Sequence, residues 1–264
     1  MDASETRPAT APAFPWLALV ILAGAIFVSV TSEVLPTGLL PQMAEGLGVS
    51  ESQIGLLVTA FAGTVVLTAA PLTSLTYRFG RKNLVIVVLF GFALSNFLGA
   101  TAPNYEIMLF SRVLGGLAHG LFWAVVGAYA GHLVPKEQLA RAVAVTVAGA
   151  TLAFILGVPI ATALGHVLGW RLAFVTVGAT IVVLTVLVMK FLPRVNHQQP
   201  LRTGEIAVPL RRDPSIFGVA IICVITTVLM TGQNLFYTYI VPFVTAVAGF
   251  AQSSVALLLL AYGI

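Results

Sequence analysis

Residues 106–131 read EIMLFSRVLGGLAHGLFWAVVGAYAG, a stretch long and apolar enough to cross a lipid bilayer as a helix. Its apolar body contains Arg112 and His119, which are two helical turns apart and therefore share one face with Trp123. A guanidinium at the centre of a membrane helix costs at least about 2.5 kcal/mol, so Arg112 should face a partner or a wet cavity. The stretch therefore predicts a helix that lines a polar pathway inside a helical bundle.

The composition of the whole chain agrees with this prediction. Of its 264 residues 59% are hydrophobic and 8% are charged, against about 25% charged in soluble proteins. Because the apolar segments are continuous, we predict an all-α polytopic bundle in a lipid bilayer. Seven spans are expected, at residues 15–41, 53–76, 83–102, 106–131, 139–163, 168–191 and 215–241, and an eighth begins near Ser253.

The basic residues lie in short loops, which argues for topology signals and against a nucleic-acid surface. All but two of the 13 basic residues fall on one side of the predicted membrane, the exceptions being Arg112 and Arg171. By the positive-inside rule the N-terminus and the segment between the sixth and seventh spans are cytoplasmic. We therefore expect a multi-pass membrane protein with a cytoplasmic N-terminus.

An internal repeat predicts the domain organisation. With a shift of 201 positions, four features of the first span and its flank recur, namely Pro41 at Pro242, Gly48 at Gly249, Ser52 at Ser253 and Leu56–Leu57 at Leu257–Leu258. Such repeats are typical of two-domain secondary transporters. We predict a cytoplasmic tail (1–14), a six-helix domain (15–192), a cytoplasmic linker (193–213) and the start of a second domain (214–264). The chain would then be truncated after the start of its eighth helix, and function would require the missing C-terminal half.

Glu33 is the one acid in the interior of a predicted span. It lies about 12 Å of helix before Pro41, and Arg112 lies about 9 Å of helix after Glu106, so both charges fall at a similar depth. If their faces meet, the two side chains should pair, and Glu33 would gain and lose a proton during transport. A static pair, or an arginine hydrogen-bonded to backbone, is the alternative.

Other polar residues on the spans are candidates for a substrate cavity. His119 is either such a residue or a hydrogen-bonded packing residue. Gln233 and Tyr237 share a face of the seventh span, and Asn234 corresponds to Glu33 in the repeat. We predict a cavity lined by His119, Trp123, Gln233, Asn234 and Tyr237, with hydrogen bonding between helices as the alternative for the last three.

The fifth span carries a small residue at every fourth position, which predicts close helix packing. Gly149, Gly157 and Gly165 belong to this series, and Pro159 is expected to bend the helix. As a set these residues are either a static packing face or a seam on which two domains rock.

The loop PLTSLTYRFGRKN, residues 71–83, joins the second and third spans through a short basic turn that Gly80 permits. It resembles the pattern Gly-x-x-x-Asp-Arg-x-Gly-Arg-Arg/Lys of the major facilitator superfamily. The matching residues are Arg78, Gly80, Arg81 and Lys82. Thr73 and Tyr77 replace the glycine and the aspartate of the pattern, so the salt bridge usually assigned to that aspartate is lost.

The resemblance extends from about residue 16 to the end of the chain. RVLGG at 112–116 is similar to the family's fourth-helix arginine motif, and Gly157-Val158-Pro159 is similar to its antiporter motif, with a different glycine spacing. The segments SEVLPTGLLP (32–41), SRVLGGLAHGLFW (111–123) and LGVPIATALG (156–165) resemble bacterial drug:proton antiporters of the arabinose-efflux and chloramphenicol-resistance type.

This resemblance implies a secondary active transporter of the bacterial plasma membrane, the cytoplasmic membrane, that exports a hydrophobic drug or a sugar-like solute by alternating access. Protons would be the coupling ion, and the proton motive force would drive transport without a cofactor or metal. Glu33 would carry the proton and Arg112 would modulate it. The fifth span would form the interdomain seam, and the loop at 78–82 would gate the cytoplasmic side.

Other classes fit less well. A retinal pump needs a lysine in its last complete span, and none follows Lys190. An intramembrane hydrolase needs a nucleophile and base or a metal set, and the chain has neither G-x-S-x-G nor H-E-x-x-H, so no enzyme is expected. A proton-coupled sugar importer and a non-transporting remnant of a transporter stay open.

Overall fold

The structure is a computed structural model that describes residues 14–76, 78–195, 216–251 and 254–263. Over these residues the secondary structure consists of helices and short connections. The elements are α1 (Trp16–Gly38), α2 (Leu40–Leu47), α3 (Glu51–Thr76), α4 (Arg81–Ala100), α5 (Tyr105–Leu133), η1 (Lys136–Gln138), α6 (Leu139–Leu152), η2 (Ala153–Gly157), α7 (Val158–Leu168), α8 (Trp170–Phe191), α9 (Ile216–Thr238), α10 (Ile240–Pro242), η4 (Phe243–Val247) and α11 (Val255–Gly263). Most of the predicted tail (1–13), most of the predicted linker (196–213) and Ser253 lie outside the described residues.

Within the described residues, seven helical segments are long and apolar enough to cross a membrane, and they follow the predicted order of spans. They are Trp16–Gly38, Glu51–Thr76, Arg81–Ala100, Tyr105–Leu133, Lys136–Leu168, Trp170–Phe191 and Ile216–Thr238. The predicted class, a polytopic membrane helical bundle, is confirmed. The fifth segment contains the π-helical turn η2 directly before Pro159, so the helix is irregular where a bend was predicted.

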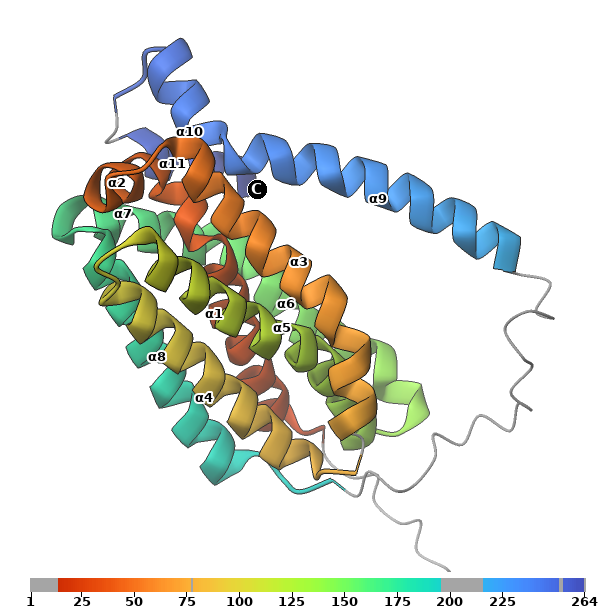
Figure 1. Cartoon of the computed structure of the whole chain (residues 1–264). Helices are drawn as coiled ribbons and strands as arrows, with labels where there is room; N and C mark the ends of the chain where they lie inside the picture. Colours follow the sequence, from red (N-terminus) through yellow and green to blue (C-terminus); the bar gives the residue numbers. More distant parts are fainter. Residues whose placement is uncertain (1–13, 77, 196–215, 252–253, 264) are drawn as a thin grey trace, which may run out of the picture.

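Helix α1 lies at the centre of the bundle and contacts α3, α5, α6, α7 and α8. In its most apolar 18-residue window 67% of the residues are buried, whereas none are buried in the corresponding window of α9. Figure 1 shows α9, in blue, projecting away from the bundle. A long, mostly apolar helix that is unburied in the protein is suited to lipid or to further helices.

The backbone supports the predicted repeat. Helices α1 and α9 have 23 residues each, and each is followed at once by a break and a short helix that contains a proline. Gly48 and Gly249, which the repeat aligns, both adopt left-handed backbone, with φ of 67° and 71°. Glycine reaches this conformation without a steric penalty, so the same turn recurs in both copies.

The glycines of the fifth span pack against the first helix. A β-carbon on Gly149 would collide with the carbonyl oxygen of Ala23, one on Gly157 with Thr31, and one on Gly165 with Leu39. The predicted close packing is therefore present, but these glycines lie inside the bundle and contact α1 and the residue after it. This geometry fits the first alternative, a static packing face, and the seam between two domains stays a prediction.

The same span also contacts the second copy, because α11 packs against η2 and α7. Val158 and Phe154 belong to an apolar cluster that includes Tyr237 and Val241 from the end of α9 and from α10, and Val255 and Leu259 from α11. Pro159 itself is buried. Beside the cluster, the Tyr239 hydroxyl packs over Gly55 of α3. The second copy thus meets the bundle at the end where α10 and α11 lie (Figure 1).

Candidate functional site

A proline in α1 fixes the position of Arg112. In a regular helix the carbonyl of Ser32 would accept from the N–H of residue 36, which is Pro36 and has none. Arg112 replaces that donor, because its Nη1 donates to the Ser32 carbonyl at 3.1 Å and its Nη2 to the Glu33 carbonyl at 2.7 Å. The side chain is 1% exposed, and its guanidinium carbon lies 4.4 Å from the ring centre of Phe61.

The predicted side-chain pair between Glu33 and Arg112 is therefore wrong in this structure. The hydrogen bonds of Arg112 go to backbone, which was the stated alternative, and the carboxylate of Glu33 turns to a different residue. Its Oε2 lies 3.3 Å from Nε2 of His119, with 32% of the glutamate side chain exposed and 5% of the histidine side chain. His119, predicted as a cavity residue, is the ionic partner of Glu33.

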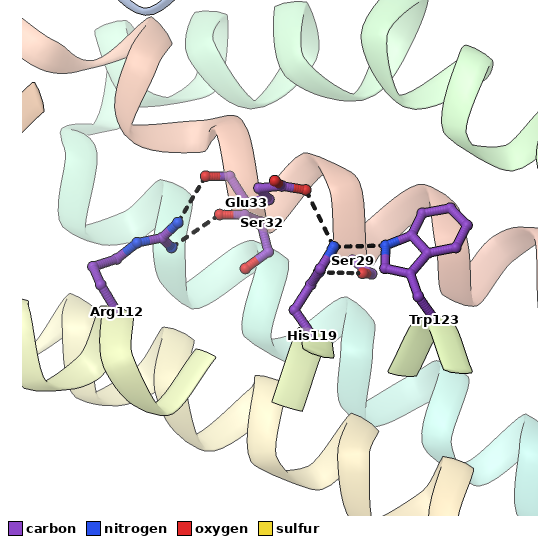
Figure 2. A network of polar contacts seen from close by, with 6 residues as sticks. All are labelled: Ser29, Ser32, Glu33, Arg112, His119 and Trp123. Carbon is purple, nitrogen blue, oxygen red and sulfur yellow. Dashed lines mark hydrogen bonds and ion pairs between the residues drawn. The ribbon is translucent and has the colours of Figure 1, made fainter. Parts of the chain in front are cut away.

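Two further polar side chains, Ser29 and Trp123, contact the imidazole of His119 (Figure 2). Ser29 Oγ lies 3.1 Å from Nδ1, and the indole Nε1 of Trp123 donates to Nε2 at 2.6 Å. The rings of Phe61 and Phe92 pack edge-on against the histidine at 5.3 and 5.7 Å between centres. The predicted shared face of His119 and Trp123 is confirmed, because the two side chains touch across one helical turn.

A polar layer that the sequence analysis missed lies behind this cluster. Asn96 of α4 exchanges hydrogen bonds with the Ser32 hydroxyl, and its Nδ2 also donates to the Phe92 carbonyl. Next to it, Ser95 donates to the Ser111 carbonyl of α5 at 2.6 Å. An amide inside an apolar span was the signal that had singled out Asn234, and the same signal would have found Asn96.

The structure does not bring Gln233 and Asn234 to the cluster, so it does not support their predicted place in the cavity wall. Both side chains are exposed on α9, and Asn234 Nδ2 donates to the Met230 carbonyl of its own helix. Tyr237 is buried, packs on Phe154 at 5.7 Å between ring centres, and belongs to the apolar cluster of Val34, the residue after Glu33. Of the three predicted residues on α9, Tyr237 lies nearest to the site.

The predicted gating loop is described except for Tyr77, which lies outside the described residues. Lys82 Nζ donates to the Met189 carbonyl in the last turn of α8 at 2.8 Å, where helix carbonyls lack a helical partner. Arg81 begins α4. Gly80 has φ −60° and ψ 128°, which other residues adopt freely, so the expectation that glycine permits this turn is wrong.

A separate cavity of about 190 Å³ opens between α1, α7 and α8. Its lining includes Thr31, Gly157 and Val177 and is almost wholly apolar. Thr31 and Glu33 are two residues apart on α1 and therefore point to opposite sides of the helix. The cavity thus lies apart from the charged cluster. Among the residues that the structure describes, no three His, Cys, Asp or Glu side chains are placed to hold a metal ion.

Comparison with known proteins points to one family. A family model described as the Major Facilitator Superfamily matches residues 22–264. A solved bacterial homologue of the human lysosomal transporter Spinster, in an inward-facing and unoccupied conformation, is 16% identical, with a TM-score of 0.76, and the match covers 96% of this chain and 60% of that one.

Two further solved structures share the fold. A D-xylose-proton symporter is 18% identical with a TM-score of 0.71, over 95% of this chain and 65% of that one. A peptide transporter in complex with sulfate is 15% identical with a TM-score of 0.60, over 90% of this chain and 48% of that one. The chain thus spans less than two thirds of the length of each of these three structures.

Proposed function

Since this chain belongs to the Major Facilitator Superfamily, we propose that it is part of a proton-coupled secondary transporter. It would export a hydrophobic drug or a sugar-like solute by alternating access, in a complete protein that contains a second transmembrane half. The membrane would be a bacterial cytoplasmic membrane with the N-terminus inside. The direction of transport and the drug:proton antiporter subtype rest on the motif resemblance of residues 32–41, 111–123 and 156–165.

The observation that carries this proposal is the pair of Glu33 and His119. Both side chains titrate, they lie 3.3 Å apart within membrane-spanning helices, and the glutamate is partly exposed while the histidine is not. Ionisable groups inside membrane helices are costly to hold, and where they occur they commonly mark ion or substrate pathways. Glu33 would carry the proton, and His119 would be the group that shares it.

Arg112 has a different role in this proposal. Its guanidinium is held by the backbone carbonyls of Ser32 and Glu33, so it is a fixed positive charge bound to the backbone of the residue that carries the carboxylate. When Glu33 is ionised, its charge and that of Arg112 cancel within the cluster, which reduces the cost of holding either in low dielectric. When Glu33 is protonated, the net charge of the cluster becomes positive, so proton binding changes the local field.

The contact between the two copies supports alternating access. The second copy touches the bundle through the apolar cluster of Tyr237 and Val158, at one end of α1, whereas α9 is otherwise exposed. Because the two copies are in contact at one end of the bundle, the opposite end can open and close as the two halves move. The loop from Arg78 to Lys82 and its contact with Met189 are the candidates for the cytoplasmic gate.

The test is proton movement in vesicles reconstituted with the complete protein, under a panel of hydrophobic drugs and pentoses. Wild-type protein should move protons when a transported solute is added, and Glu33→Gln should abolish that movement. Glu106→Gln is the matched control, because Glu106 is an exposed carboxylate in the first turn of α5. Equal proton movement in wild type and Glu33→Gln would remove Glu33 from the coupling, and solute uptake with the proton gradient would show an importer.

A further inference from the structure

One nitrogen of His119 faces two competing groups. Its Nε2 lies 2.6 Å from the indole Nε1 of Trp123 and 3.3 Å from Oε2 of Glu33. An imidazole nitrogen presents either one hydrogen or one lone pair, never both. Figure 2 shows both contacts meeting at the same atom of the ring. The two partners therefore cannot both be satisfied in every protonation state of the cluster.

The chemistry of the partners defines two exclusive states. An indole N–H only donates, so the Trp123 bond requires an Nε2 without a hydrogen, and the ring proton is then on Nδ1, 3.1 Å from Ser29 Oγ. If Nε2 takes a proton, the new N–H donates to Glu33, and the indole N–H must turn away. Trp123 and a proton thus compete for one lone pair.

We propose that Trp123 is a positioning residue that sets how tightly the Glu33–His119 pair holds its proton. This inference rests on the proposed function and extends it to the solute. Trp123 is 37% exposed, whereas His119 is 4% exposed, so the indole is the member of this contact that an incoming solute can reach. A solute that packs on the indole and holds its N–H on Nε2 lowers the proton affinity of the pair, and the proton leaves to water.

By linkage, a proton on Nε2 then weakens solute binding by the same factor, which is the coupling that an antiporter needs. The titratable and charged groups around the ring are few. Helix α1 contributes Glu33, α5 contributes Arg112, and α3 and α4 present the uncharged rings of Phe61 and Phe92. The competition is therefore set by a small number of groups.

The experiment is NMR of the complete protein in nanodiscs, with the tryptophan indoles and histidine rings labelled with nitrogen-15. The sequence contains three tryptophans and four histidines. The signals that disappear in Trp123→Phe and in His119→Gln are therefore those of the Trp123 indole and the His119 ring. As pH falls, the Trp123 indole signal should lose its hydrogen-bonded shift at the same midpoint at which His119 takes a proton. An indole signal that stays fixed through the His119 titration would overturn the proposal.

The Trp123→Phe variant gives a second readout, because it keeps an aromatic ring and removes only the donor. Loss of one hydrogen bond should raise the proton affinity of His119 about three- to tenfold, moving its midpoint up by about half to one pH unit. Trp16→Phe, the same change in an exposed residue outside the cluster, should leave it unchanged.

The two proposals fail differently. If vesicles show no proton movement that depends on Glu33 while the NMR midpoints coincide, the proposed function is wrong and the competition stands. If the vesicles show proton movement that depends on Glu33 while Trp123→Phe leaves the titration midpoint of His119 unchanged, the proposed competition between Trp123 and the proton is wrong.

Discussion

Replacing Pro36 by alanine should make Arg112 less important for stability. The Ser32 carbonyl lacks a helical donor because residue 36 is proline, and Arg112 Nη1 supplies one at 3.1 Å. An alanine N–H would restore the ordinary helical bond to that oxygen. In the Pro36→Ala background, removing Arg112 would therefore no longer leave the Ser32 carbonyl without a hydrogen-bond donor, as it does in the wild-type background.

The size of the effect follows from that acceptor. A buried carbonyl left without a partner costs about 1–3 kcal/mol, and measured hydrogen bonds between membrane helices reach at most about 1.7 kcal/mol. In a double-mutant cycle of Arg112→Met and Pro36→Ala, we therefore expect a coupling free energy of about 1–2 kcal/mol. The lost bond to the Glu33 carbonyl and the lost charge occur in both backgrounds and cancel from the cycle.

The assay is thermal unfolding in detergent, followed by tryptophan fluorescence. About 1 kcal/mol shifts the unfolding temperature by about 2–4 °C in a protein of this size. Arg112→Met should lower the apparent unfolding midpoint in both backgrounds. The decrease should be about 2–8 °C smaller in the Pro36→Ala background than in the wild-type background, with all scans run at one heating rate. Pro71→Ala, the same change inside α3, is the control and should show no coupling. Purely additive effects of Arg112→Met and Pro36→Ala would refute the reasoning.

Two further stability predictions come from the packing of the bundle. Gly149→Ala should destabilise the protein by about 1–3 kcal/mol because the new methyl group meets the Ala23 carbonyl. Gly127→Ala is the control: its methyl group meets open space, so the change should be neutral or should stabilise the protein by up to about 1 kcal/mol. Equal unfolding midpoints for the two variants would contradict this prediction. Asn96→Leu should cost about 0.5–2 kcal/mol in the same scans, because it removes the bonds to the Ser32 hydroxyl, and an unchanged midpoint would show that the polar layer adds nothing.

The order of the spans was predictable because it depends on length and apolarity alone. A run of about 20 apolar residues has few alternatives to a membrane helix, whatever its neighbours are. The recurrence of Gly48 at Gly249 was equally accessible, since left-handed turns require glycine and leave a mark in the sequence. These features are local, and a single sequence contains them.

The partner of Glu33 was not predictable by the same means. Counting residues from the helix ends gives the depth of a side chain, and on depth alone Arg112 and Glu33 match. Pairing also needs the rotation of each helix about its axis, which packing decides. Pro36 was the sequence feature that pointed to the partner of Arg112. A proline inside a helix leaves the carbonyl four residues before it, here that of Ser32, without a helical donor, and Arg112 was the available cation.

The glycine series shows a similar limit. A small residue at every fourth position predicts that some helix comes close, but it does not say which one. Gly157 approaches Thr31 of α1, and the neighbouring Val158 contacts the second copy. Adjacent residues on one helix thus face different parts of the molecule, and the spacing alone does not say which residue contacts which part.

The repeat also allows the first helices of the two copies, α1 and α9, to be compared position by position. Both copies have the same turn after the long helix, with prolines at 41 and 242 and left-handed glycines at 48 and 249. Under the same shift Glu33 corresponds to Asn234 and Pro36 to Tyr237, so the second copy has neither the acid nor the proline that frees a carbonyl. Without that carbonyl, α9 offers no backbone site that calls for an arginine. Over the aligned residues the two copies therefore share the turn after the long helix, whereas the acid and the helix-internal proline occur in α1 and have no counterpart in α9.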